Sequence, residues 1–161
     1  MYNNPNFVPD FGLGSLFAVI RDWNQRAGHM PKTSAEANVQ WFLDETYRNR
    51  AMDLLTEEVA EMSDAIRTMD QVEMLDAAAD IIFVLAGIIE KAGLGEYMDE
   101  VMAEVIESNN TKIPLDGNTI RDANGKIGKP STYRAPDLPK AMRRVDRREA
   151  SRRYSSFGPN H

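Results

Sequence analysis

The sequence predicts an all-α fold, a bundle of four to five helices followed by a short β-hairpin and an irregular extension. No Pro or Gly occurs from residue 35 to residue 69, which leaves room for one long helix or for two helices joined by a bend. No alternation of apolar and polar residues, the pattern of a half-buried strand, occurs before residue 118. A chain of 161 residues with 42% hydrophobic residues is long enough to bury a core within one domain.

Signals at the ends of the predicted helices support each of them in turn. Ser15 is a candidate N-cap for a first helix that Gly28 ends. The helix over residues 71–92 has Gly93 as its stop signal. A further helix over about residues 96–109 carries its apolar residues on one stripe.

After these helices the chain becomes irregular. Residues 118–128 contain an Asn-Gly pair between two short β-prone segments, which predicts a hairpin turn. Three prolines then prevent a regular helix before about Lys140. We expect one domain over residues 1–138, with the hairpin segment at about 113–138, and a tail over residues 139–161.

Charge divides the chain into an acidic body and a basic tail. Residues 139–161 carry seven Lys or Arg and two acidic residues, so the tail is +5 and the remainder −11. An acidic body argues against a nucleic-acid surface on the fold, while the tail can steer a phosphorylated ligand, touch RNA or keep the terminus soluble. The chain has no Cys, and its longest apolar run, residues 81–89, is too short to span a bilayer. We therefore expect a soluble cytoplasmic protein.

Carboxylates in an apolar helix are the most informative feature. Residues 74–89 are apolar on nearly all sides yet contain Asp76 and Asp80. Buried charges need a partner, because the lost hydration costs several kcal/mol per ion. Upstream stand three more carboxylates, Glu57, Glu58 and Glu61, in a segment without Lys or Arg from Met52 to Ile66. The compensating charge is then expected to be a cation from solution.

Helical spacing brings these carboxylates together. Asp76 and Asp80 share one face of their helix, as Glu57 and Glu61 do on theirs, while Glu58 turns toward the packed side. If the two helices are antiparallel, like charges converge and favour divalent ions, and oxygen ligands without Cys or His select Mg²⁺ or Mn²⁺. The alternatives are a solvated acidic face and, for Asp80, a capped or ion-paired carboxylate.

The order of the motifs carries a resemblance. Glu57-Glu58-x-x-Glu61, then Asp76 and Asp80 in an apolar helix, then the segment 108–112, the hairpin and the segment 133–138 resemble the all-α nucleotide pyrophosphatases. That superfamily includes MazG-type enzymes, dimeric dUTPases and phosphoribosyl-ATP pyrophosphohydrolases. The likeness is greatest to the phosphoribosyl-ATP pyrophosphohydrolase-like branch, which is common in bacteriophages, and it covers about residues 16–138.

The resemblance implies a site and a reaction. Two or three Mg²⁺ or Mn²⁺ ions would be held by the first acidic motif and by Asp80. In the usual second motif, Glu-x-x-Asp, this chain has Ala77 at the Glu position, and Asp76 is the candidate substitute. The implied site residues are the metal ligands Glu57, Glu58, Glu61, Asp76 and Asp80, the phosphate-binding Asn109, Lys112, Lys126 and Lys129, and the base-binding Trp23, Asn24 and Tyr133. Core packing for Trp23 and a solvated loop for the lysines of the lid remain the alternatives.

The implied reaction converts a nucleoside triphosphate and water to the monophosphate and diphosphate, with Glu58 as a metal ligand or general base. Deoxynucleotides, including a purine such as dGTP, are the expected substrates. Helices that are apolar on more than one side predict a homodimer or a dimer of dimers.

Two other classes of protein also use helical carboxylates or this fold. A di-iron bundle requires Glu-x-x-His motifs, whereas His29 follows a Gly outside the carboxylate helices and His161 ends the chain. A non-catalytic helical interaction protein with an impaired metal site remains the alternative to an enzyme.

Overall fold

A computed structural model describes residues 12–113 and 119–156 of the chain. Within these ranges the protein is helical, with one isolated antiparallel bridge between Arg121 and Ile127, and the predicted all-α class is confirmed. The elements are α1 (Leu13–Arg26), α2 (Ser34–Leu43), α3 (Glu45–Thr68), α4 (Gln71–Lys91), a 3₁₀ turn (Gly95–Tyr97), α5 (Met98–Asn110) and α6 (Leu138–Ser156). The chain divides into two compact units between Glu96 and Tyr97.

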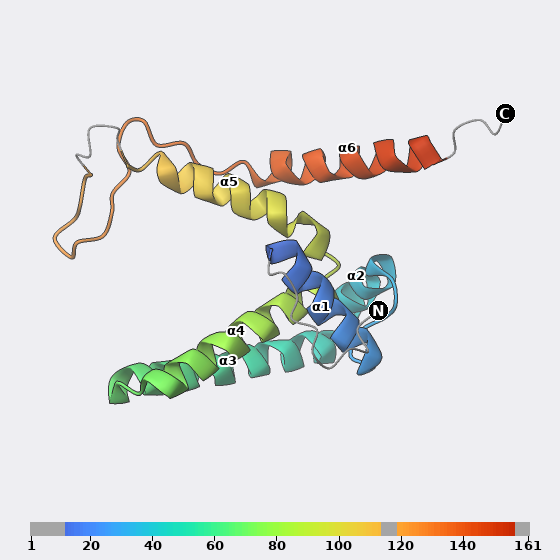
Figure 1. Cartoon of the computed structure of the whole chain (residues 1–161), viewed down its shortest axis with the longest axis horizontal. Coiled ribbons are helices and arrows are strands. Elements are labelled where there is room, and N and C mark those ends of the chain that lie inside the picture. The colour runs from blue at the N-terminus through green and yellow to red at the C-terminus, as the bar shows by residue number, and fades with distance from the viewer. Residues whose placement is uncertain (1–11, 114–118, 157–161) are drawn as a thin grey trace. The chain divides into compact units, whose positions relative to one another are not determined.

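In the first unit, the long helices α3 and α4 form an antiparallel pair (Figure 1). Met69, in the left-handed conformation at φ 57°, ends α3, and the Asp70 carboxylate caps α4 by accepting hydrogen bonds from two backbone N–H groups. Helix α1 packs on α4, and α2 contacts both long helices. Alanines such as Ala51, Ala65 and Ala77 are buried, which lets the helix backbones approach closely.

Helix ends in the first unit differ in part from the sequence prediction. The proposal of Ser15 as an N-cap is wrong, because α1 begins at Leu13 after Gly12, and Ser15 lies inside its first turn. The segment 35–69 contains two helices, since Asp44 is extended and its carboxylate accepts a hydrogen bond from the Tyr47 N–H to start α3. Gly93, at φ 71°, follows the last residues of α4, as predicted.

The second unit consists of α5, the turn segment and α6. The Asn-Gly turn lies where it was predicted, with Gly125 at φ 79° and the Asp122 carboxylate accepting from the Asn124 and Lys126 N–H groups. The pairing is limited to the single bridge, so no strand forms among the described residues. Residue 118, the start of the predicted hairpin, and the N-terminal segment before residue 12 lie outside the described residues.

The basic tail contains a helix that is bound to the rest of its unit. Helix α6 begins at Leu138, with Pro139 in the first turn, where a missing N–H costs nothing. Arg144 donates to the Glu100 carboxylate at 2.8 Å and also pairs with Glu104 at 3.3 Å. The Tyr97 hydroxyl donates to Asp146 at 2.9 Å. Holding α6 against α5 is therefore one role of the tail's charges that the sequence interpretation missed.

Many large apolar side chains of the long helix pair are exposed, among them Val59, Ile66, Val72, Leu75 and Ile82. Even so, none of the helices within residues 12–113 and 119–156 combines the length and apolar character needed to cross a membrane.

Candidate metal and nucleotide site

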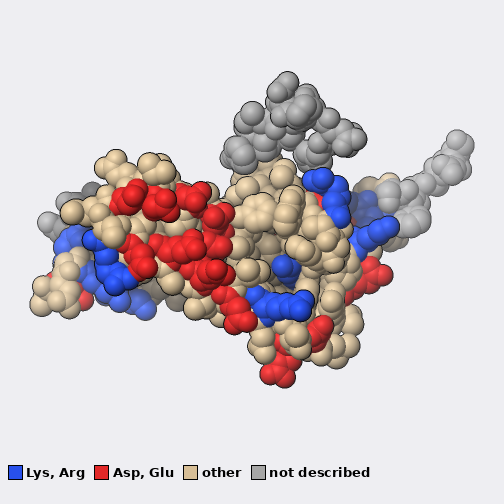
Figure 2. All heavy atoms as spheres, turned by 90° about the horizontal axis from the view of Figure 1, so that it is seen from below, with Lys and Arg blue, Asp and Glu red and all other residues tan. Residues whose placement is uncertain are grey.

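Five carboxylates come together midway along the helix pair. Glu57, Glu58 and Glu61 are on α3, and Asp76 and Asp80 are on α4. Because α3 and α4 run antiparallel from the turn at Met69, residues at equal distances from that turn lie opposite each other. Glu58 is therefore level with Asp80. Figure 2 shows Asp and Glu side chains gathered into a patch on the side of the molecule where α3 and α4 lie.

Glu58 is the electrostatic centre of this cluster. Its pKa is raised above the ordinary value, first by partial removal from water and then by the negative charges of Asp80, Glu61, Glu57 and Asp76, in that order. Glu58 is partly buried, whereas the other four are exposed. The convergence of carboxylates from two helices, which the sequence predicted, is thus present in the structure.

Within residues 12–113 and 119–156, the cluster has no compensating cation of its own. Among the described residues, no ion pair or hydrogen bond joins any of the five carboxylates to another side chain. One expectation is corrected. Asp76 and Asp80 are exposed in the single chain rather than desolvated, and apolar neighbours such as Leu75 and Ile82 are exposed as well.

The chemistry of the donor set fits a hard divalent cation, since it consists of carboxylate oxygens without sulfur or imidazole. Within the described part of the chain, no three Asp, Glu, His or Cys side chains are already arranged as ligands of one ion. Four of the five carboxylates are exposed and can rotate, so binding requires their side chains to turn inward. Ala77, at the position of the usual second-motif Glu, is buried, while Asp76 is exposed.

The two residues predicted to bind the base differ in their surroundings. Trp23 is 41% exposed, and its ring meets Phe83 of α4 edge to face at 5.2 Å between centroids. Asn24 is buried, and its amide donates to the Ile20 carbonyl at 2.9 Å. Trp23 therefore offers part of its ring to a ligand, while the Asn24 amide is already engaged within α1. Their role in base binding stays a prediction.

Most of the predicted phosphate-binding residues lie together in the second unit. The Lys112 ammonium donates to the Asn109 side chain at 2.7 Å. Lys112 and Lys129 both lie over the Tyr133 ring, at 5.6 and 4.8 Å from its centroid. Lys126 is exposed in the turn segment. A base stacking on Tyr133 would have to compete with these two cations for the ring.

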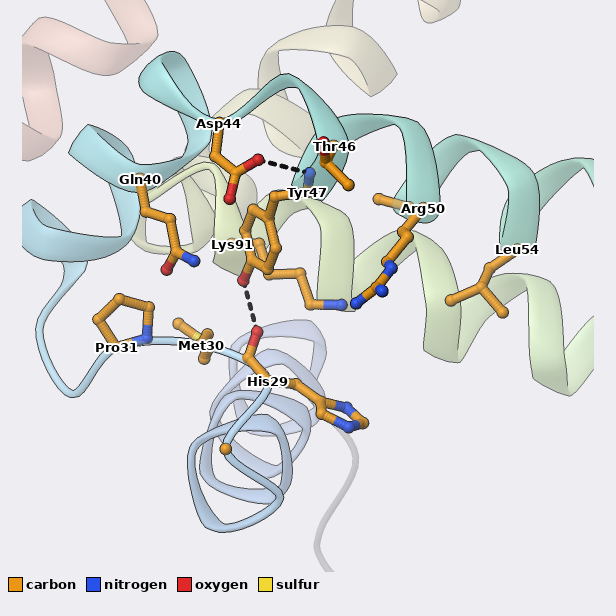
Figure 3. A pocket seen from close by; sticks show the side chains of 12 residues that line it. His29, Met30, Pro31, Gln40, Asp44, Thr46, Tyr47, Arg50, Leu54 and Lys91 are labelled. Carbon is orange, nitrogen blue, oxygen red and sulfur yellow. Dashed lines mark hydrogen bonds between the residues drawn. The ribbon is translucent and has the colours of Figure 1, made fainter.

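One pocket of about 630 Å³ was not predicted from the sequence. It lies within the first unit and is lined from α2, α3, α4 and the α1–α2 connection (Figure 3). Its basic residues are Arg50 on α3 and Lys91 on α4. The signal that could have found them is helical spacing, because Arg50 shares a face of α3 with Glu57, and Lys91 shares a face of α4 with Asp80.

The antiparallel helix pair, with carboxylates presented from both helices, agrees with the class that the sequence resembles, the all-α nucleotide pyrophosphatases. Residues 24–109 match the family model described as phosphoribosyl-ATP pyrophosphohydrolase. The chain belongs to this family, within the MazG-like superfamily, and the family is one of pyrophosphohydrolases that act on nucleotides. The matched region contains all five carboxylates and ends at Asn109, before Lys112. No curated protein sequence matches the chain.

Proposed function

We propose that the protein is a metal-dependent nucleoside triphosphate pyrophosphohydrolase that acts on deoxynucleotides, with dGTP among the candidate substrates. The main support for this proposal is the surroundings of Glu58. Four other carboxylates lie around it, and no cation among the described residues compensates them. A triphosphate is itself highly negative, so it can approach such a cluster only together with cations. Family membership supplies the reaction type, and the carboxylates supply the reason for a metal.

The residues that would hold two or three Mg²⁺ or Mn²⁺ ions are Glu57, Glu58, Glu61, Asp76 and Asp80. Ions held there would supply positive charge that neutralises phosphate oxygens and makes the attacking water more acidic. As the alternative to its role as a metal ligand, Glu58 is the general base and accepts the proton of that water. The water oxygen forms a bond to the α-phosphorus, the bond from phosphorus to the bridging oxygen breaks, and diphosphate leaves with the electron pair. The assignment of Asn109, Lys112, Lys126 and Lys129 of the second unit to phosphate binding stays a prediction.

The active form that we propose is a homodimer or a dimer of dimers. Support comes from the exposed apolar side chains of the carboxylate-bearing helices, for example Leu75 and Val72, each 74% exposed. Such a surface is costly to leave in water. A second copy would cover it and would draw the carboxylate cluster further out of solvent.

The test is a substrate panel on the purified full-length chain. Diphosphate release from the eight common ribo- and deoxynucleoside triphosphates is measured with Mg²⁺, with Mn²⁺ and with chelator. We expect release from at least one deoxynucleotide, dependent on metal and lost in Glu58→Ala and Asp80→Ala. Glu45→Gln, an exposed carboxylate at the start of α3, is the matched control. A folded wild-type protein that releases no diphosphate from any nucleotide would favour the non-catalytic interaction protein.

A further inference from the structure

The unpredicted pocket in the first unit combines polar and cationic side chains with an aromatic ring. Gln40 and Asp44 line one side, Tyr47 lies in the middle, and Arg50 and Lys91 line the other side (Figure 3). The Tyr47 hydroxyl donates to the His29 carbonyl at 2.5 Å, which fixes the ring in place. Burial, and then the charge of Asp44, raise the pKa of Tyr47 to about 12, so the hydroxyl stays a donor at neutral pH.

Within the part of the chain that the structure describes, the two cations of the pocket have no acidic partner. Among the described residues, no carboxylate lies within ion-pair distance of Arg50 or Lys91. Figure 3 shows the charged ends of these side chains pointing toward one another. Lys91 is half-buried with its ammonium 5.8 Å from the centre of the Tyr47 ring, and burial lowers its pKa. Asp44, the acidic residue in the lining, accepts the Tyr47 N–H at the start of α3.

Two adjacent cations, one of them partly desolvated, form a site that favours an anion. The pocket volume of about 630 Å³ leaves room for a phosphate group. Arg and Lys are the side chains that bind phosphate oxygens most effectively, Arg through its planar fork and Lys as a point charge.

The position of the pocket relates it to the carboxylate cluster. Arg50 precedes Glu57 by seven residues, two helical turns, which is about 10 Å along α3 on the same face. Lys91 follows Asp80 by eleven residues, about three turns along the same face of α4. The carboxylates and the cations thus lie in succession on one side of the helix pair, with Leu54 of the pocket lining between Arg50 and Glu58.

We infer that Arg50 and Lys91 bind the terminal phosphate of the nucleoside triphosphate, at the end that leaves as diphosphate. This inference rests on the proposed function, in which the carboxylates hold the metal-bound phosphates nearest the sugar. The phosphate chain then runs from the carboxylate cluster toward the pocket. The two cations stabilise negative charge that grows on the leaving diphosphate as its bond to the α-phosphorus breaks.

Comparison of triphosphate with diphosphate substrates tests this assignment. We measure the steady-state kcat and KM of the wild-type, Arg50→Gln and Lys91→Gln proteins with two substrates. One is the preferred deoxynucleoside triphosphate, and the other is the deoxynucleoside diphosphate of the same base, which lacks the terminal phosphate. Loss of one charged hydrogen bond predicts a fall in kcat/KM of about 10- to 100-fold for the triphosphate. For the nucleoside diphosphate, kcat/KM should change by less than about twofold, since this substrate has no terminal phosphate that could lose a contact. Lys32→Gln, an exposed lysine outside the pocket lining, is the matched control.

An equal loss on both substrates would overturn the assignment, as would no loss on either. A second measurement tests phosphate binding by Arg50 independently of the proposed hydrolysis. Calorimetric titration of the full chain with tripolyphosphate and Mg²⁺ should show binding that weakens by about the same factor in Arg50→Gln and recovers in Arg50→Lys. If no nucleotide is hydrolysed but this pattern holds, the proposed function fails while the pocket still binds phosphate. If tripolyphosphate binds all variants alike, the pocket assignment fails.

Discussion

Glu58 of α3 faces Asp80 of α4, and among the charged groups that raise the pKa of Glu58, Asp80 has the largest effect. The two residues lie at the level of the helix pair where the acidic motifs of α3 and α4 are opposite each other. Like charges on such facing residues destabilise the folded chain unless a cation lies between them. Stability and metal binding should therefore be coupled at this pair.

Asp80→Asn is expected to raise the thermal stability of the metal-free protein slightly, because it removes a repulsive charge beside Glu58. Mg²⁺ should stabilise the wild-type protein and stabilise the variant less. Diphosphate release should fall by about 10²-fold or more. Thermal unfolding with and without Mg²⁺ checks the coupling. A variant that is less stable than wild type without metal would contradict it.

Gly93→Ala is expected to destabilise the first unit by about 1–3 kcal/mol. Gly93 has φ 71°, and a Cβ placed there would lie 2.7 Å from the Ser34 carbonyl oxygen, so strain and a clash add together. Gly28→Ala is the matched control, because Gly28 has the same φ of 71° but nothing within 4 Å of an added Cβ. Urea unfolding, followed by Trp fluorescence, measures the free energy of unfolding of both variants. Equal losses for the two variants would show that the contact with α2 is unimportant.

The sequence predicted the elements that depend on local signals and missed those that depend on distant partners. Asp80 and the three glutamates of α3 were identified because a carboxylate stands out in an apolar helix and because helical spacing shows which residues share a face. Asp44 was missed as a helix boundary, since a lone Asp without Gly or Pro is compatible with a continuous helix. The pairing of Arg144 with Glu104 joins residues 40 positions apart, and no local pattern reports it.

Acid should weaken the second unit through Glu104. This carboxylate is buried, and the backbone N–H of Asp137, then Arg134 and Arg144, lower its pKa to about 2. Because the folded pKa lies below the ordinary value of 4.5, the stabilisation is complete above that ordinary value. It is lost as the pH falls from about 4.5 toward 2.

Hydrogen exchange of α5 peptides between pH 6 and pH 2.5 measures this loss. Glu104→Gln should exchange faster at pH 6 and should show a flatter dependence of protection on pH. Glu107→Gln is the control, because Glu107 contacts the same Arg134 at 3.3 Å but its side chain is 70% exposed. The explanation fails if Glu104→Gln retains the wild-type pH dependence.

In the proposed oligomer, the exposed apolar residues at the start of α4 would lie in the interface between copies. Val72 and Leu75 stand on the first turns of α4 and are each 74% exposed, so in the single chain they lose little contact with water. If a second copy covers them, Leu75→Glu places a charge in an apolar interface and should shift the protein to monomers. Tyr154→Glu, at a residue that is 85% exposed in α6, should leave the assembly unchanged. Light scattering after gel filtration at micromolar concentration distinguishes these outcomes. A wild-type monomer would contradict the oligomer, and an unchanged Leu75→Glu assembly would place the interface elsewhere.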